Sequence, residues 1–380
     1  MTKHTNPRIW KPVYSITAKT ANLLMAIEAA RAEVEHLVIP PTVETELRRQ
    51  AQLRSTHYST RIEGNRLTLV EADKVIRGAK VSFRGRERDV REVRNYWNAL
   101  LRIEEWAEAN KPVSEELIRK LHALVEHGPR ARPTPYRDGQ NVIRDAASGA
   151  IVYLPPEARD VPHLMASMVG WIGIARTTGV PMPLLAGLAH YQFVTIHPYF
   201  DGNGRTARLL ATFLLHRGGY GLNGFLSIEE HHARDLASYY RALVVHPHHN
   251  YYEGRADSDL TSWVDYFVAT LAETFEAART EAVRLAKKGV PALPEPLRKL
   301  DHRARTVLSL FARSEHVAAP DVAEVLGLSD RMARVLLAEW VKAGWLVVAN
   351  PSRRKRAYAL SAKYRQYIGS LSAMGARRHT

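Results

Sequence analysis

Residues 197–208 read His-Pro-Tyr-Phe-Asp-Gly-Asn-Gly-Arg-Thr-Ala-Arg, and they constrain the fold more than any other segment. Pro198 disfavours helical backbone in the residue before it, so a helix is expected to end near His197. Gly202 and Gly204 permit a tight turn, and the apolar pattern that follows predicts a second helix beginning just after Gly204. Unpaired N–H groups and the positive end of the dipole at a helix start attract anions. The segment therefore predicts an anion site between two helices.

The side chains of this segment predict phosphate chemistry. Arg205 and Arg208 are three residues apart on the second helix and can reach one polyphosphate. Asp201 would tolerate neighbouring phosphates if a cation such as Mg²⁺ lay between them. His197 is close enough to take a proton from a hydroxyl group. Each residue alone has an ordinary explanation, such as a helix cap for Asp201, but their combination favours a functional site.

Length and composition suit a globular protein of more than one domain. The chain has 380 residues, of which 46% are hydrophobic and 24% charged, so two or three separate cores are expected. It contains no cysteine, which excludes disulfides and thiolate chemistry. Its first ten residues lack the apolar core of a signal peptide, and no run of 18 apolar residues occurs. We therefore expect a cytoplasmic protein without a membrane segment.

The spacing of apolar residues predicts a mainly helical fold. We expect an N-terminal helical region over 1–110, a helical core over 111–286, a proline-rich linker over 287–302 and a further domain over 303–380. Within the core, helices are predicted at 115–124, 161–174, 183–196, 228–245 and 260–285. In the N-terminal region, the Pro40-Pro41 pair is expected to separate two helices, the second starting near Thr42.

One segment of the core has the pattern of a β-hairpin. Residues 140–143 and 150–154 are rich in β-branched side chains, a turn-like stretch over 145–149 separates them, and Pro155-Pro156 follows. A single hairpin in a helical protein indicates a functional element.

The C-terminal domain carries much of the positive charge. From residue 303 onward, 14 Lys plus Arg stand against 5 Asp plus Glu, which is +9 of the total of +15. Helices are predicted at 303–312, 321–326 and 330–343, followed by strands at 345–349 and 357–360, in the order of a winged helix-turn-helix. A recognition helix would present Arg331, Arg334 and Lys342, with Arg353–Arg356 as a basic wing. The domain would then contact DNA or another protein.

The segment at 197–208 resembles the signature His-Pro-Phe-x-Asp/Glu-Gly-Asn-Gly-Arg-x-x-Arg of the Fic (Fido-fold) enzymes, with Tyr199 in place of Phe. These enzymes usually transfer AMP from ATP to a protein hydroxyl group, so the resemblance implies ATP and Mg²⁺ as ligands. It implies that His197 is the general base and that Asp201 holds Mg²⁺. It further implies phosphate contacts from Gly202, Asn203, Gly204, Arg205 and Arg208.

The same resemblance extends to two neighbouring segments. The hairpin corresponds to the flap that lines the nucleotide site and pairs with the target protein, with Ala150, Ile151, Val152 and Tyr153 at that place. Tyr239 and Tyr240 match a Tyr-Tyr-x-x-Leu pattern whose aromatic rings lie near the base and ribose. An Asn that some relatives have seven residues further on is Pro247 here.

An inhibitory motif of the family, Ser/Thr-x-x-x-Glu-Gly/Asn, is matched by Ser59, Glu63 and Gly64. By resemblance, Glu63 pairs with Arg208 and removes the cation that should hold the γ-phosphate. A homodimer is expected by the same analogy.

Three alternatives remain at this point. The chain is a DNA-binding regulator that acts through its C-terminal domain, a Fic enzyme that removes AMP, or a Fic enzyme that uses another nucleotide. His231-His232 and the His246-Pro-His248-His249 cluster are predicted to be polar loop and helix residues rather than a zinc site, because no carboxylate or cysteine stands at structural-site spacing.

Overall fold

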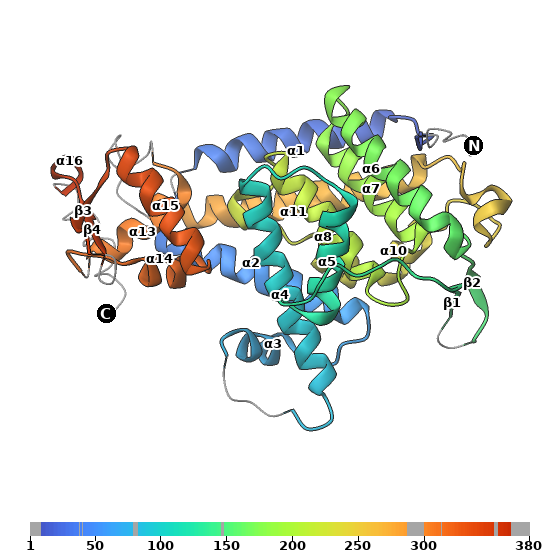
Figure 1. Cartoon of the computed structure of the whole chain (residues 1–380). Helices are drawn as coiled ribbons and strands as arrows, with labels where there is room; N and C mark the ends of the chain where they lie inside the picture. The colour runs from blue at the N-terminus through green and yellow to red at the C-terminus, as the bar shows by residue number, and fades with distance from the viewer. Residues whose placement is uncertain are drawn as a thin grey trace, which may run out of the picture. The chain divides into compact units, whose positions relative to one another are not determined.

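A computed structural model describes residues 9–37, 39, 41–78, 83–145, 148–286, 300–312, 314–352 and 356–365. The chain divides into two compact units, 1–31 with 51–277 and 32–50 with 278–380. The first unit contains most of the helices labelled in Figure 1. They are α3 (Leu69–Ile76), α4 (Glu87–Glu108), α5 (Glu115–His127), α6 (Val161–Thr177), α7 (Met182–Ile196), α8 (Asn203–Arg217), α9 (Ile228–Arg234) and α10 (Leu236–Leu243). Helices α1 (Ala18–His36), α2 (Pro41–Ile62) and α11 (Thr261–Ala286) each contribute residues to both units.

Helices α7 and α8 form the centre of the first unit. Almost every residue of both helices is buried, including Leu185, Phe193 and Phe213, which have no exposed surface. A helix that is buried on all sides needs an apolar sequence all round, and the run Met-Pro-Leu-Leu-Ala-Gly-Leu-Ala in α7 supplies one. The two predicted helices that flank the 197–208 segment are therefore the most firmly packed elements of this unit.

A close approach between α7 and α11 fixes the position of this core. A Cβ atom at Gly187 would lie 2.6 Å from the ring of Phe267, so the two backbones pack at a distance that only glycine allows. Trp263 of α11 donates a hydrogen bond from Nε1 to the carbonyl of Gly187, 2.8 Å away. The C-terminal end of α7, which carries the candidate base, thus rests on a rigid support.

The helix expected over 228–245 is wrong, because the chain forms two helices there. Asp235 separates them with non-helical backbone (φ −130°, ψ 71°), and its carboxylate accepts a hydrogen bond from the backbone N–H of Ser238. This contact caps α10 and satisfies an N–H group that a continuous helix would bond internally. The break gives α10 its own direction and places Tyr239 in its first turn.

The hairpin is present, but its strands are shorter than expected: β1 covers Ile143–Arg144 and β2 covers Ile151–Tyr153. They pair antiparallel with a register shift, Ile143 opposite Tyr153 and Arg144 opposite Ile151. Beyond β2 the backbone pairs with the segment before η3 (Tyr251–Arg255), through Leu154 N–H to His249 O (2.8 Å) and Tyr251 N–H to Leu154 O (3.0 Å). These bonds anchor the base of the hairpin.

The second unit has its own core and the element order expected from the sequence. Its elements are α13 (His302–Leu308), η4 (Ser309–Ala312), α14 (Ala319–Leu326), α15 (Asp330–Lys342), β3 (Leu346–Asn350), β4 (Ala357–Leu360) and α16 (Ala362–Arg365). Trp340 and Trp345 lie at the centre of a cluster that also buries Val307, Val322 and Leu337. The assignment as a winged helix-turn-helix stays a prediction. Residues 287–299 of the linker predicted over 287–302, and the wing residues Arg353–Lys355, lie outside the described residues.

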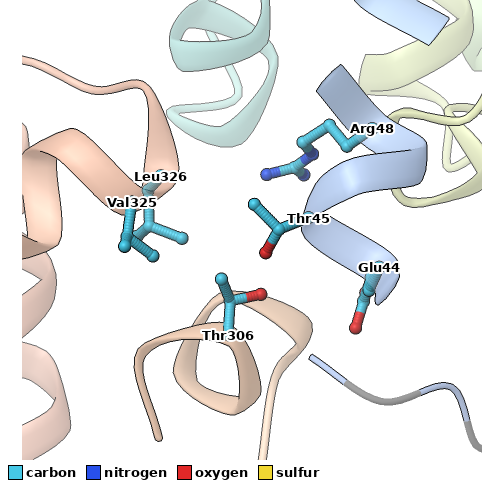
Figure 2. Close-up of a pocket in the computed structure, with 6 residues that line it drawn as sticks. All are labelled: Glu44, Thr45, Arg48, Thr306, Val325 and Leu326. Atoms are coloured by element: carbon cyan, nitrogen blue, oxygen red, sulfur yellow. The ribbon is translucent and has the colours of Figure 1, made fainter. Parts of the chain in front are cut away.

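A small cavity in the second unit contains a buried acid. Glu44 and Arg48 of α2 lie with Thr306 of α13 and Leu326 of α14 around a space of about 10 Å³, as Figure 2 shows. The carboxylate of Glu44 is 3% exposed and has no hydrogen-bond partner in the described part of the chain. Burial raises the pKa of Glu44 to about 7, although Arg305 and Arg48 oppose the shift. The space admits about one water molecule and no larger ligand.

None of the described helices is both long enough and apolar enough to span a lipid bilayer.

Candidate functional site

A cavity of about 650 Å³ opens in the first unit where the 197–208 segment, the hairpin and α10 meet. Its lining combines His197 and Arg208 with the carboxylate of Glu63, and apolar side chains with aromatic ones. The lining residues used below are Glu63, Ile143, Arg144, Val152, Tyr153, Val194, His197, Gly204, Arg208, Tyr239 and Tyr240. A concave, mainly apolar site with a few converging polar groups is typical of a small-molecule site.

His197 occupies the end of α7 in a left-handed conformation (φ 51°, ψ 59°). That conformation is uncommon outside glycine, and it turns the chain sharply into Pro198. Nδ1 lies 3.3 Å from the carbonyl of Val194, so Nδ1 carries the proton and Nε2 is free to accept one. Burial lowers the pKa of His197 to about 4, and the ring is therefore neutral at physiological pH. The residue has the protonation state that a general base needs.

Arg137 holds the turn at His197 in place. Its Nε donates to the carbonyl of His197 and its backbone N–H to the carbonyl of Pro198, each at 2.9 Å. A third bond runs from Nη1 to Gly139 O, again at 2.9 Å. Arg137 is 4% exposed, so these bonds are shielded from water. The strained turn is thus determined by a side chain that lies 60 residues earlier in the sequence.

Asn203 stabilises the loop before α8 through its side chain. Its Oδ1 accepts from the backbone N–H of Tyr199 at 3.0 Å, and its Nδ2 donates to the carbonyl of the same residue at 2.8 Å. The ring of Tyr199 is buried and stacks on His122, with centroids 3.6 Å apart. Helix α8 begins at Asn203 rather than after Gly204. Of the three predicted cradle residues, Gly204 lines the cavity, whereas Gly202 and Asn203 shape the turn beside it.

Asp201 and Arg205 belong to a charged network beside the cavity. Arg205 is 2% exposed, and its Nη2 lies 2.8 Å from Glu126 and 3.2 Å from Asp201. Arg88 reaches the other carboxylate oxygen of Asp201 at 3.3 Å. A Cβ atom at Gly202 would overlap the carboxylate of Glu126, which explains glycine at this place. Arg205 therefore orients Asp201 and is not among the residues that line the cavity.

Asp201 remains accessible to a cation despite these bonds, because its side chain is 59% exposed. The described residues contain no group of three or more metal-ligating side chains. Mg²⁺ is ordinarily bound by one or two carboxylates together with substrate phosphates, and a single exposed aspartate beside an anion cradle fits that pattern.

Arg208 is paired with the segment that matched the inhibitory motif. Its Nη2 lies 2.8 Å from Oε1 of Glu63 and 2.9 Å from the carbonyl of Ser59, and its Nε donates to Ser59 Oγ at 2.8 Å. Burial lowers the pKa of Arg208, but Glu63 and the nearby Tyr239 more than offset this, so the pKa is raised overall. Gly64, at the end of α2, has a positive φ of 88° and lets the chain turn away at once.

Glu63 also lies against the start of α8. A Cβ atom at Gly204 would overlap Oε1 of Glu63, so the carboxylate rests on the backbone at the positive end of the helix. The carboxylate of Glu63 thus occupies the position at the start of α8 where an anion would bind. It also forms an ion pair with the guanidinium of Arg208.

Behind Arg208, a buried aromatic group supports the site. The hydroxyl of Tyr239 is 3.1 Å from Nε2 of His190, whose ring stacks on Trp263. Burial, helped by Arg208, lowers the pKa of His190 to about 3, so the ring is neutral. Tyr240 is 48% exposed at the cavity wall. Tyr239 therefore packs as core, and Tyr240 presents its ring to the cavity.

Both strands of the hairpin contribute to the cavity, β1 through Ile143 and Arg144 and β2 through its last two residues. Val152 and Tyr153 line it, and the Tyr153 hydroxyl donates to the carbonyl of Thr195 at 2.7 Å. Ile151, 45% exposed, and Ala150 lie outside the lining. Of the four predicted flap residues, Val152 and Tyr153 therefore line the cavity, whereas Ala150 and Ile151 do not.

Sequence patterns missed several residues that this geometry shows to matter: Arg137, Glu126, Arg88 and His190. Their role depends on distant partners, and no motif or periodicity marks them. The one available signal was the Ala-His190-Tyr-Gln-Phe run before the main segment.

Comparisons with known proteins agree with this geometry. Residues 112–215 match the model of the Fic/DOC family. A similar solved structure, a Fic family protein from Desulfovibrio desulfuricans G20, superposes with a TM-score of 0.59 at 26% identity over 93% of this chain and 99% of that one. Another, a Fic domain containing signaling protein from Bacteroides thetaiotaomicron VPI-5482, gives a TM-score of 0.60 at 25% identity over 70% of this chain and 97% of that one.

Several curated relatives carry the name protein adenylyltransferase Fic, and the matches to two of them are as follows. The protein of Drosophila willistoni is 26% identical over 203 residues, or 52% of this chain and 38% of its own length. The protein of Nematostella vectensis is 28% identical over 180 residues, or 45% of this chain and 39% of its own length. The chain thus matches about two fifths of the length of these relatives.

Proposed function

We propose that this protein transfers AMP from ATP to a hydroxyl group of a protein side chain. The observation that carries the proposal is the presence of His197, Gly204 and Arg208 around one cavity of about 650 Å³. A neutral imidazole, the start of a buried helix and an arginine are the groups that nucleotidyl transfer to a hydroxyl requires. The names of the curated relatives, protein adenylyltransferase Fic, support the same reaction.

The reaction assigns a role to each of these groups. The target hydroxyl oxygen attacks the α-phosphorus while Nε2 of His197 takes its proton. The bond from the α-phosphorus to the bridging oxygen breaks, and pyrophosphate leaves. Gly204 and Arg208 bind the phosphates through the start of α8 and the guanidinium. Asp201 would hold Mg²⁺, which supplies positive charge to the phosphates.

The hairpin supports docking of a target segment. Ile151 and Val152 are 45% and 39% exposed at the edge of a two-stranded sheet, and Val152 lines the cavity. An exposed edge of this kind accepts an extended segment by backbone pairing. Such pairing would place a Ser, Thr or Tyr hydroxyl beside His197.

We further propose that Glu63 keeps this transfer activity low. It pairs with Arg208 at 2.8 Å and lies on the backbone of Gly204, so a nucleotide loses two contacts for its terminal phosphates. A triphosphate that binds without them adopts a pose unsuited to in-line attack.

Label position tests the proposed reaction directly. The purified Glu63→Gly variant is incubated with Mg²⁺ and ATP that carries the label either on the α- or on the γ-phosphate. AMP transfer leaves the α-label on the protein and the γ-label in solution. Retention of the γ-label would instead show phosphorylation, and retention of neither would contradict nucleotidyl transfer. The same experiment with labelled GTP, CTP and UTP decides which nucleotide is the donor.

A further inference from the structure

Glu229 of α9 is a buried carboxylate that the reaction described above does not use. It is 1% exposed, and both of its oxygens accept hydrogen bonds from hydroxyl groups. Ser55 Oγ donates to Oε2 at 2.8 Å, and the hydroxyl of Tyr96 donates to Oε1 at 3.1 Å. The neighbouring Glu230 pairs directly with two arginines, whereas Glu229 has no direct ion pair in the described part of the chain. A buried carboxylate is unfavourable without a compensating cation, so its partner must be reached through other groups.

Tyr96 of α4 connects this carboxylate to Ser59. The ring of Tyr96 has no exposed surface, and its hydroxyl also forms a side-chain hydrogen bond with Ser59. Burial and the nearby Glu229 raise the pKa of Tyr96, and Arg208 and Ser59 oppose the rise. The hydroxyl therefore stays protonated. Because its proton is donated to Glu229, its oxygen accepts the bond from Ser59.

Ser59 carries the connection on to Arg208. Its Oγ accepts from Nε of Arg208 at 2.8 Å, and its carbonyl accepts from Nη2 at 2.9 Å. A hydroxyl that donates to Tyr96 keeps lone pairs for the guanidinium. A chain of hydrogen bonds thus runs from Arg208 to Glu229, and each hydroxyl in it donates in the same direction. Bonds in such a chain polarise and strengthen one another, above all where water is excluded.

This chain meets the restraint at the end of α2. Ser59 lies in the last turn of α2, Glu63 follows the helix by one residue, and both bind the same guanidinium. Ser59 fixes the direction of Nε, and Nη2 is thereby directed at Glu63. The side chain of Glu63 is 31% exposed, whereas Glu229 supplies a second carboxylate from the buried side. Neither Glu229 nor Tyr96 lines the cavity, so neither would touch a nucleotide.

We propose that Glu229 is a positioning residue that holds Arg208 against α2. It acts through the hydroxyls of Tyr96 and Ser59, and it favours the arrangement in which Glu63 pairs with the guanidinium. The inference rests on the proposed function, because the restraint that it explains is the restraint on AMP transfer. It predicts that this restraint weakens when the chain of hydrogen bonds is broken at a distance from the cavity.

Rates of self-modification test the functional part. The initial rate of label transfer from α-labelled ATP with Mg²⁺ is measured for wild type, Tyr96→Phe and Glu229→Gln. Tyr96→Phe keeps the ring and removes the connecting hydroxyl, and Glu229→Gln keeps the shape and removes the charge. Both should raise the rate about 2- to 10-fold, the range expected for about one hydrogen bond. Neither should raise it further in the Glu63→Gly background, where no restraint is left.

Two further variants separate this chain from simple anchoring of α2. Ser55→Ala removes the other hydrogen bond of Glu229 and leaves the chain to Arg208 intact. Glu230→Gln makes the same change as Glu229→Gln at the neighbouring residue. Both should leave the rate within about twofold of wild type. A rise in Ser55→Ala equal to that in Tyr96→Phe would overturn the inference, because Glu229 would then act only by fastening α2.

A double-mutant cycle on melting temperature tests the connection without requiring any transfer. Glu229→Gln should lower the melting temperature of wild type by about 3 to 8 °C, because buried Arg208 loses compensating charge. Arg208→Met removes the cation and leaves a side chain of similar shape. In that background, Glu229→Gln should leave the melting temperature unchanged or raise it, since it removes a buried carboxylate without a cation. Equal falls in both backgrounds would show that Glu229 only supports packing and would overturn the inference.

Failure of the inference can be told apart from failure of the proposed function. Unchanged rates in Tyr96→Phe and Glu229→Gln, beside a faster rate in Glu63→Gly, would overturn the inference and leave the proposed function intact. Absence of AMP label on Glu63→Gly would contradict the proposed function, and the regulatory role of Glu229 would fall with it.

Discussion

Arg208 and Glu63 form an ion pair with Nη2 and Oε1 2.8 Å apart, although 145 residues separate them in the sequence. Arg208 is 1% exposed, so the pair is shielded from salt and solvent on the arginine side. The same carboxylate rests on the backbone of Gly204 at the start of α8. Glu63 thus contacts both groups that would bind the terminal phosphates of a nucleotide, the guanidinium of Arg208 and the backbone of Gly204.

Ser59→Ala is expected to release this restraint in part. The change removes the hydrogen bond from Arg208 Nε to Ser59 Oγ, 2.8 Å long, but leaves the ion pair with Glu63. Loss of one such bond is worth about 1 kcal/mol, so self-modification should rise roughly 2- to 10-fold. The initial rate of label transfer from α-labelled ATP measures it. Thr60→Ala, whose hydroxyl bonds within α2, is the control, and equal rates for the two variants would show that Ser59 does not restrain Arg208.

The pH dependence of transfer should report the unusual state of His197. Burial lowers its pKa to about 4, and only the neutral ring accepts a proton. Activity of Glu63→Gly should therefore stay level from pH 8 to about 5.5 and fall as the pH approaches 4. Glu63 raises this pKa, so its removal moves the fall further toward acid. An apparent pKa near 6.5 in a pH–rate profile, with circular dichroism showing folded protein throughout, would contradict the geometry at the end of α7.

Arg205→Lys distinguishes two roles for Arg205. The sequence predicts a phosphate contact, whereas the structure places its Nη2 on Glu126 and Asp201. Lysine keeps the charge but cannot satisfy both carboxylates in the same geometry. In the Glu63→Gly background we expect the transfer rate to fall about 10- to 100-fold because Asp201 is no longer oriented. The affinity for ATP without divalent cation should change less than about threefold. A parallel loss of affinity would favour the phosphate contact.

Glu44→Gln should alter stability rather than activity. The pKa of Glu44 is about 7 in the folded protein and about 4.5 when unfolded, so the folded state holds the extra proton between these values. Stability of the second unit therefore falls as pH rises from 4.5 to 7. The variant should lack this fall and be more stable at pH 8 by up to about 3 kcal/mol, since each pKa unit is worth 1.36 kcal/mol. Melting temperatures at pH 5 and 8 test this, with Glu46→Gln on the same helix as control. Equal shifts in both variants would contradict it.

Sequence patterns predicted the helical class and the segment at the centre of the site. The two helices around residues 197–208 were predictable because α7 is apolar on all sides and Pro198 and Gly202 fix its connection to α8. The break at Asp235 was not, because an apolar pattern at helical spacing continues across it and only the capping bond to Ser238 ends the helix. In such a segment, the helix propensity of the residues has less influence on the backbone than one well-placed side-chain hydrogen bond.

Within the site, residues of the motif were predictable and their partners were not. The pairing of Glu63 with Arg208 was expected from a resemblance, and the ion pair is present. The hydrogen bond of Arg137 to the turn at His197 and the ion pair of Glu126 with Arg205 join residues from different elements. Such contacts follow from tertiary packing, which local spacing does not encode. The homodimer, the winged helix and its DNA or protein partner stay predictions.

The central proposal is that Glu63 restrains a transfer reaction in which His197 is the general base. Intact mass spectrometry of the purified protein with ATP and Mg²⁺ tests it most directly. Glu63→Gly should gain an adduct with the mass of AMP less one water, at least about tenfold more than wild type. The double variant Glu63→Gly with His197→Ala should gain none, and Glu116→Gln, which removes an exposed carboxylate from α5, should behave as wild type. Equal adduct in wild type and Glu63→Gly would contradict the restraint, and an adduct in the double variant would contradict the role of His197.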